Sequence, residues 1–346
     1  MTTTWKAPAK LILFGEHSVV YGKHAVAAAL SLSTIASAKY VRYPGATSLD
    51  VVVHTAGRRR CSGSGADDEE DAKKLKNAIA AIAASIEKKA VGKLEIWIGG
   101  NVPEGAGLGS SAALSVAVAA AVNDVLKGFV SVQPEIWRTT INNAALEGER
   151  IFHDNPSGVD NTVSSHGGAL LFAKGTAPKH FSLSSKEGGR SIRVLIVDTG
   201  VPRSTKDAIL AVRGRLEADK GRIEGAFERM DAIALEAFDI LQARPVNVSA
   251  LDALVDENHK LLRDVLGVGH PALDKAVSLC AASGIHAKIS GAGCGGCVFG
   301  FIKDSFPSRD LSDLISKLTA EGMRPYVVDL GASGVCEVPT EPPPSS

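Results

Sequence analysis

The sequence has no net charge, few cysteines and no long uninterrupted apolar segment. Its 38 Lys and Arg residues balance 38 Asp and Glu residues in a chain of 346, which argues against a protein whose main task is to coat nucleic acid or an anionic membrane. Five cysteines, an odd number, do not indicate a disulfide framework. Cys294 and Cys297 have no second pair at zinc-ligand spacing, so we interpret them as small side chains beside a glycine-rich turn.

No targeting segment is recognisable either. The N-terminal residues show no charged region followed by an apolar signal core, and the last residues are not a peroxisomal address. The longest apolar stretch, AALSVAVAAAVNDVL, is shorter than the ~20 residues that span a bilayer. We therefore expect a soluble, cytoplasmic protein.

Hydrophobic periodicity and turn signals predict an α+β fold in two halves. In the first half, strands are predicted at residues 10–15, 25–43, 51–54, 93–100 and 169–172, and helices at 70–89, 111–126, 134–152 and after Pro156. Residues 58–71, basic and then acidic, are expected to form a charged surface loop. In the second half, strands are predicted at residues 192–200, 287–290, 297–302 and 324–330, with helices between them. We place the domains at 1–188 and 189–346, the second ending in a short mobile tail.

The stretch PEGAGLGSSAAL, residues 103–114, is glycine-rich but contains no lysine. It lacks the lysine of a P-loop, and Ser110 stands where a dinucleotide-binding fingerprint needs its last glycine. The N–H groups at the start of the following helix attract phosphate, and serine hydroxyls bind phosphate or ligate Mg²⁺. The alternative is an N-cap serine after a flexible turn. The stretch itself does not show which cation would offset the charge of a bound phosphate.

Two carboxylates flank a predicted bend in LEGERIFHDNPSGVDN. Glu149 lies near the end of one helix and Asp160 near the start of the next, with Pro156 and Gly158 between them. If both acids converge on one cleft, one can hold a metal while the other accepts a proton from an alcohol. The alternative is a pair of surface acids on a helix-turn-helix.

Three further stretches are candidates for a site. Lys10 enters an otherwise apolar strand in APAKLILFGEH, where a lysine either protects an edge or serves as a functional cation. The turn in KISGAGCGGCVFG is so rich in glycine that a ligand or another backbone must approach it closely. In TGVPRSTKDA, Ser204 or Thr205 begins a helix, and capping is the simpler explanation.

Taken together and in this order, these stretches resemble the motifs of the GHMP kinases over residues 7–300. Within that superfamily they are most similar to those of the mevalonate kinases. The resemblance implies a two-domain GHMP kinase fold, with an N-terminal α+β ATP-binding domain that contains a left-handed crossover and a ferredoxin-like C-terminal domain. It also implies transfer of phosphate from ATP to the primary alcohol of mevalonate with Mg²⁺, in a homodimer that prenyl diphosphates inhibit by feedback.

The resemblance also implies roles for individual residues. The phosphate loop would comprise Gly105, Ala106, Gly107, Leu108, Gly109, Ser110 and Ser111. Ser111 and Glu149 would ligate Mg²⁺, and Asp160 would be the catalytic base that Lys10 keeps ionised. The substrate-binding residues would be Lys10, Glu16, His17, Asp160 and Thr205, and residues 291–296 would support the phosphate loop from the second domain.

The sequence departs from the family pattern at two positions. Ala9 stands where the family has glycine, and Cys294 interrupts the second glycine run. Neither removes a chemical group, so we expect modest effects on affinity. Two alternatives remain, a sister kinase for another small alcohol and a silent sensor that binds ATP and a metabolite.

Overall fold

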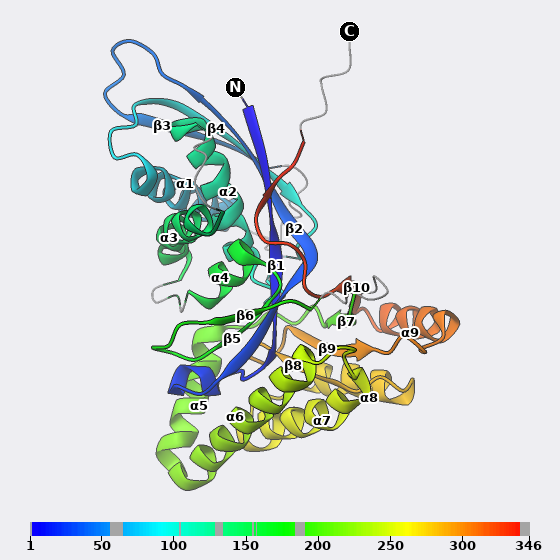
Figure 1. Ribbon diagram of the computed structural model, residues 1–346. Helices are drawn as coiled ribbons and strands as arrows, with labels where there is room; N and C mark the ends of the chain where they lie inside the picture. Colours follow the sequence, from blue (N-terminus) through cyan, green and yellow to red (C-terminus); the bar gives the residue numbers. More distant parts are fainter. Residues whose placement is uncertain are drawn as a thin grey trace.

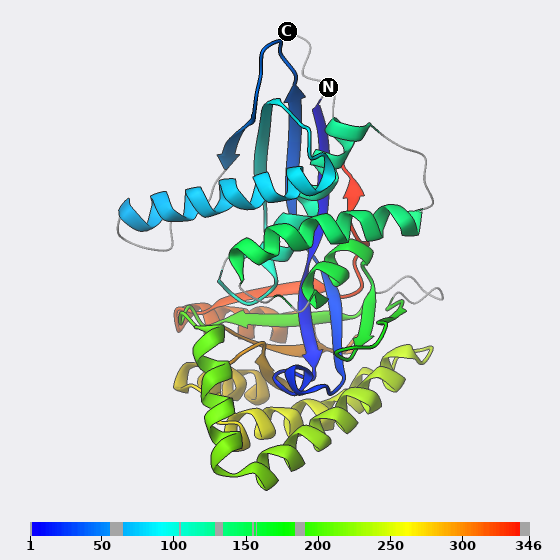
Figure 2. The ribbon, with the colours of Figure 1, turned by 90° about the vertical axis from the view of Figure 1, so that its left-hand side faces the viewer.

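The computed structural model describes residues 2–55, 65–103, 105–128, 134–153, 156, 158–183 and 191–339. Over these residues the chain forms two sheets, each covered by helices (Figures 1 and 2). The elements of the first half are β1 (Thr2–Phe14), η1 (Ser18–Tyr21), β2 (Ala25–Val41), β3 (Leu49–Thr55), α1 (Gly65–Ile86), β4 (Gly92–Gly100), α2 (Ser110–Lys127), α3 (Pro134–Phe152), α4 (Val159–His166), β5 (Ala169–Phe172) and β6 (Lys179–Phe181). Those of the second half are β7 (Arg193–Asp198), α5 (Thr205–Ala218), α6 (Lys220–Gln242), η2 (Val248–Leu251), α7 (Asp252–Lys260), η3 (Leu261–Val265), α8 (Pro271–Ala282), β8 (Ala287–Ser290), β9 (Cys297–Ile302), α9 (Ser308–Ala320), β10 (Arg324–Asp329) and β11 (Cys336–Glu337).

The first sheet has the order β11-β1-β2-β4-β3, with β5 and β6 attached to β2. Its strand pairs are antiparallel except for β3 and β4, which are parallel and joined by the crossover helix α1. Helices α1 to α4 lie on one side of this sheet (Figure 1). The apolar helix α2 is long enough to span a membrane by length and composition, but residues 112–122 are buried, as in a core helix.

The second sheet has the order β10-β7-β9-β8, and its neighbouring strands are antiparallel. Counted along the chain, its strands occupy the order 4-1-3-2, the ferredoxin-like arrangement. The predicted α+β class with a ferredoxin-like second half is therefore confirmed.

Two predicted boundaries in the first half are wrong. Strand β1 begins at Thr2 instead of Lys10, because buried Thr3, Trp5 and Ala7 already alternate with more exposed residues. Helix α1 begins at Gly65, so the acidic run at residues 67–71 is helical instead of looped. Acidic residues are favoured near a helix N-terminus, where they face its positive end. The first part of that predicted loop, residues 58–64, lies outside the described residues.

The C-terminal part of the chain returns to the first sheet. Strand β11 pairs with β1 at Trp5 and Lys6, and Val338 N–H donates to Thr4 O over 2.8 Å. Strand β11 thus belongs to the first sheet although it follows the second half in sequence, and the predicted domain division stays a prediction. The predicted boundary at residue 188 lies outside the described residues, as does the predicted tail at 339–346 apart from Pro339.

Strand β1 runs through both halves of the molecule (Figures 1 and 2). Its first part pairs with β11 and β2, and near its end Ser290 Oγ of β8 donates to Ile12 O over 3.2 Å. Its pairing with β2 is irregular between Pro8 and Lys10, where Ser164 Oγ donates to Pro8 O over 2.8 Å. This irregularity lies beside the candidate site, which is where bulges commonly redirect a side chain.

Candidate active site

Lys10 connects three elements at the middle of the first sheet. Its backbone N–H donates to Leu108 O over 2.9 Å, which ties β1 to the glycine loop. Its ammonium Nζ lies 3.0 Å from Asp160 Oδ2 in the first turn of α4. Lys10 is buried, whereas the Asp160 side chain is 36% exposed and therefore open to a ligand. The lysine and the aspartate that the sequence analysis singled out are thus in direct contact.

The glycine loop leads into α2 without a side-chain cap. Gly105, Gly107 and Gly109 have φ of 72°, 82° and 72°, which L side chains rarely adopt. Gly109 is the N-cap of α2, so the N–H groups of the first turn, including that of Ser111, are available to an anion.

Two of these glycines leave room for a cation. A Cβ atom at Gly109 would lie 2.8 Å from Lys10 Cγ, and one at Gly107 would overlap the guanidinium of Arg203. The loop that lacks a lysine is therefore approached by two cationic side chains from elsewhere in the chain.

Arg203 is a site residue that the sequence analysis did not single out. It precedes Ser204, which caps α5 by accepting Asp207 N–H at 3.2 Å, as predicted. Its guanidinium lies among Gly107, Gly291 and Gly296, and its buried Nη1 has no hydrogen-bond partner among the residues that the structure describes. Burial lowers the pKa of Arg203, which nearby Cys297 and Asp160 oppose. A guanidinium with such a buried nitrogen at a phosphate loop is suited to binding an anion.

Glu149 lies in the last turn of α3 and is only 3% exposed. Its Oε2 accepts a hydrogen bond from Ser111 Oγ and its Oε1 one from Ser115 Oγ, both over 3.2 Å. Burial, together with the charge of Asp160, raises the pKa of Glu149 to about 7, against the two hydroxyl hydrogen bonds. Ser111 Oγ also lies 3.3 Å from His153 Nε2.

These donors fit a hard divalent cation. Ser111 and Glu149 present oxygen atoms, the ligand type that Mg²⁺ prefers. A cation here would offset the mutual repulsion of Glu149 and Asp160, which the protein alone relieves only in part.

Comparison with known proteins agrees with this geometry. Residues 73–168 match the family described as GHMP kinases N terminal domain, and residues 246–319 match GHMP kinases C terminal. The chain is 36% identical to mouse mevalonate kinase over 378 aligned residues, covering 95% of this chain and 93% of the mouse protein. This chain belongs to the mevalonate kinase family of the GHMP kinases.

More distant members of the family also match this chain in sequence or in fold. The mevalonate kinase of Archaeoglobus fulgidus is 30% identical, over 92% of this chain and 98% of its own. Among solved structures, L. major mevalonate kinase in complex with R-mevalonate superposes with a TM-score of 0.76 at 24% identity, covering 95% of this chain and 96% of that one. At this identity the superposition shows a shared fold.

The mevalonate kinase motif Gly15-Glu16-His17 does not join Lys10 and Asp160 in this structure. Glu16 is buried and is bound by Lys288 and by Asn258 Nδ2, which donates over 3.1 Å. These contacts fix the Glu16 carboxylate, and its substrate-binding role stays a prediction.

His17 and Thr205 were also expected to bind substrate. His17, at φ 60°, donates from Nε2 to Ala292 O over 2.9 Å, and burial lowers its pKa. Thr205 is exposed at the start of α5, two residues after Arg203. Their substrate-binding roles stay predictions.

The second glycine turn, residues 291–296, supports Arg203. Thr199 Oγ1 donates to Gly296 O over 2.7 Å and Gly296 N–H to Val201 O over 3.0 Å, which binds the turn to the segment before Arg203. Through Arg203 the turn meets Gly107, so its contact with the phosphate loop runs through this side chain.

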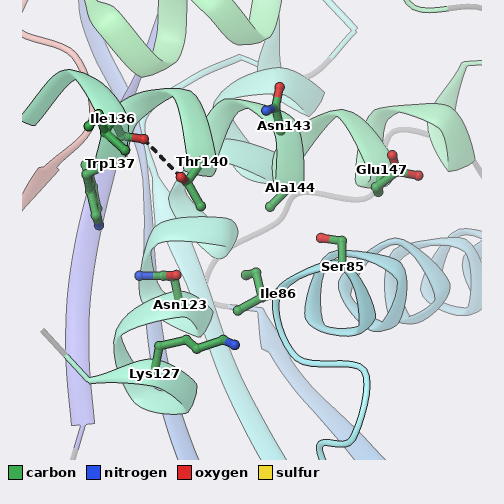
Figure 3. Close-up of a pocket in the computed structure, with 10 residues that line it drawn as sticks. All are labelled: Ser85, Ile86, Asn123, Lys127, Ile136, Trp137, Thr140, Asn143, Ala144 and Glu147. Atoms are coloured by element: carbon green, nitrogen blue, oxygen red, sulfur yellow. Dashed lines mark hydrogen bonds between the residues drawn. The ribbon is translucent and has the colours of Figure 1, made fainter. Parts of the chain in front are cut away.

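A cavity of about 560 Å³ lies elsewhere, between α1, α2 and α3 (Figure 3). Its lining includes Asn123, Lys127, Trp137 and Asn143, and none of the predicted site residues. Asn123 is twelve residues beyond Ser111, roughly 18 Å along α2 at the rise of an α-helix. We therefore do not assign the phosphate chemistry to this cavity.

Proposed function

We propose that this chain transfers the γ-phosphoryl group of ATP to the primary alcohol of (R)-mevalonate, which gives 5-phosphomevalonate for isoprenoid and sterol synthesis. The observation that carries this proposal is the 3.0 Å contact of Lys10 Nζ with Asp160 Oδ2, beside Gly109 and the start of α2. Support also comes from relatives named mevalonate kinase and from the L. major protein solved with R-mevalonate.

Phosphoryl transfer requires mainly alignment of the reactants and charge that offsets the phosphate oxygens. The uncapped N–H groups at the start of α2 bind the phosphates of ATP. Lys10 and Arg203 supply positive charge from opposite sides of the loop. Asp160, in contact with Lys10, accepts the hydrogen bond of the substrate hydroxyl and then its proton.

We propose that Ser111 and Glu149 hold Mg²⁺. When bound, the ion offsets charge on the phosphate oxygens. Ser115 orients the Glu149 carboxylate from the side away from Ser111 by its hydrogen bond to Oε1.

An ADP-release assay against mevalonate, galactose, homoserine and phosphomevalonate tests the proposed function. We expect ADP release with mevalonate and background release with the other three. A preference for another alcohol would assign the chain to a sister activity. Binding of ATP without turnover of any alcohol would indicate a silent sensor.

The family resemblance supports two further proposals, a homodimer and feedback inhibition by prenyl diphosphates at the ATP site, and we also propose a cytoplasmic location. Light scattering at micromolar protein tests the first. For the second, inhibition by farnesyl diphosphate should be competitive with ATP, because both ligands present a diphosphate to the same loop. Imaging of a tagged chain in cells tests the third.

A further inference from the structure

Glu16 and Lys288 form a salt bridge buried between the two halves of the molecule. Glu16 follows β1, and Lys288 lies in β8 of the second sheet. Both side chains are 0% exposed. We call these two residues the Glu16–Lys288 pair.

The surroundings of this pair are partly polar and partly aromatic. Lys288 Nζ also donates to Ile289 O over 3.0 Å and lies 5.4 Å from the ring centre of Phe14 and 5.0 Å from that of Phe299. On the other side, Asn258 Nδ2 holds Glu16 Oε2. Both charged groups therefore have fixed partners in one geometry.

Stability alone does not account for such a pair. Removing two charges from water costs about as much as their attraction returns, and apolar replacements of similar volume are often as stable or more so. Phe14 and Phe299 already belong to an apolar cluster at this point, so apolar side chains would suit the site. The best-attested use of a buried ion pair is to fix register between elements.

The Glu16–Lys288 pair links the segment that carries Lys10 to the segment that borders Arg203. Glu16 is six residues beyond Lys10, and Lys288 is three residues before Gly291, which borders Arg203. Lys10 and Arg203 approach the same glycine loop from the two halves of the molecule. A shift of β1 against β8 would therefore change the spacing of these two cations.

We propose that the Glu16–Lys288 pair is a positioning device that holds Lys10, Asp160 and the phosphate loop in register with Arg203. This inference rests on the proposed kinase activity. Glu16 and Lys288 act through other residues and do not touch the reacting atoms.

The test compares three proteins with the wild type: Lys288→Met, the double variant Glu16→Gln/Lys288→Met, and the control Lys23→Met. The double variant removes both charges, and the amide introduced at position 16 keeps a carbonyl oxygen for Asn258 Nδ2. Lys23 pairs with Glu228 and also joins the first half to the second, but in a solvent-exposed position. For each protein we would measure kcat, KM for both substrates, the Kd for ADP by calorimetry, and urea unfolding.

Lys288→Met leaves one buried charge unpaired, so we expect it to unfold at lower urea than the wild type. The double variant should regain most of the stability that Lys288→Met loses. Its kcat should nevertheless fall by about 10- to 100-fold, as expected for misplaced reactants. Its Kd for ADP should stay within about threefold, because ground-state binding depends mainly on the phosphate loop. Lys23→Met should match the wild type in kcat, in both KM values, in the Kd for ADP and in urea unfolding.

A double variant with wild-type stability and wild-type kcat would overturn the inference, since the pair would then be a packing feature only. If the double variant does not fold, Glu16→Gln alone decides, because it keeps the volume and the Asn258 contact. Glu16→Gln leaves the Lys288 ammonium unpaired and should also unfold at lower urea. A fall in kcat of the folded variant, measured well below its unfolding midpoint, supports the inference, and an unchanged kcat overturns it. A wild-type protein that phosphorylates no mevalonate contradicts the proposed function instead.

Discussion

Lys10 and Arg203 reach one glycine loop from opposite halves of the molecule. A P-loop carries its lysine within the loop, which fixes the cation to the phosphate-binding backbone. Here Lys10 comes from β1 and Arg203 from the residue before the cap of α5. At the scale of single residues, the site therefore depends on side chains whose neighbours in the sequence do not bind phosphate.

Replacing Arg203 with methionine should lower kcat/KM by about 100- to 1000-fold, the usual effect of removing one preorganised charge. The free energy of unfolding should hold or increase, because a buried guanidinium nitrogen without a partner disappears. Steady-state kinetics and urea unfolding check both parts. Arg213→Met, on the exposed surface of α5, is the control. Normal kcat/KM in Arg203→Met would exclude Arg203 from the site.

Asp160→Asn should lower turnover by about 100- to 10,000-fold, the range for a positioned acid–base group. ATP should still bind, because the glycine loop and α2 are untouched. Turnover in the ADP-release assay and ATP affinity by calorimetry measure the two effects. Asp313→Asn, exposed on α9, serves as the control. Turnover near the wild-type rate in Asp160→Asn would remove this residue from the proposed role.

Glu149 predicts a pH dependence of the metal-free protein. Its pKa is about 7 in the folded state and near 4.5 when exposed. A raised pKa gives stability that is full below pH 4.5 and is lost as the pH rises through 7, a change of up to roughly 3 kcal/mol.

Urea unfolding of metal-free protein at pH 5 and pH 8 measures this change. Glu149→Gln should flatten the difference, whereas Glu147→Gln, an exposed acid on the same helix, should leave it intact. If the wild type, Glu149→Gln and Glu147→Gln all showed the same change in unfolding free energy between pH 5 and pH 8, the assignment of this pH dependence to Glu149 would be contradicted.

At the scale of elements, the glycine loop depends on two separate properties of glycine: it adopts a left-handed backbone conformation, and it has no side chain to crowd a neighbour. Gly105 and Gly109 share a φ of 72°, but only Gly109 has a side chain, that of Lys10, where a Cβ would stand. An alanine at either position should cost ~1–2 kcal/mol of stability from the left-handed backbone. Only Gly109→Ala should also displace Lys10 and lower kcat, by about 10- to 100-fold. Equal kcat values in the two variants would refute this separation of strain from crowding.

The sequence predicted most elements because their signals are local. Helix α3 begins at Pro134 and ends at Phe152 as predicted, and Ser204 caps α5 as predicted. The start of β1 was predicted too late, since Trp5 and Ala7 show only a short alternation. Strand β11 has two residues, too few for a periodic pattern.

The site was less predictable, because its members meet only through tertiary contacts. Lys10 and Asp160 were expected to meet on the strength of the family resemblance, and they do. Arg203 lies in the quoted stretch TGVPRSTKDA, but its role was not predicted, since its place is set by two glycine turns that are far apart in the sequence. Lys288 in a strand resembles a surface residue, and its burial appears only when β1 docks against β8.

At the scale of the whole molecule, the end of the chain completes the first sheet. Val335 is buried, its N–H donates to Ser165 O over 3.2 Å, and β11 covers the edge of β1. A chain that ends at Leu330 should lose ~5 °C or more in Tm and should aggregate, because the edge of β1 is uncovered. A chain that ends at Pro339 keeps these contacts and is the control. Calorimetry and size-exclusion chromatography make the comparison, and equal melting of the two chains would show that β11 is dispensable.

Because about 320 residues separate β1 from β11, the sheet that carries Lys10 acquires its last strand only after residue 337 has left the ribosome. The nascent first half waits with one flank uncovered while about 150 further residues are translated, which at ordinary elongation rates lasts on the order of ten seconds. The edge of β1 on the Lys10 sheet is therefore covered only after the second half has been translated.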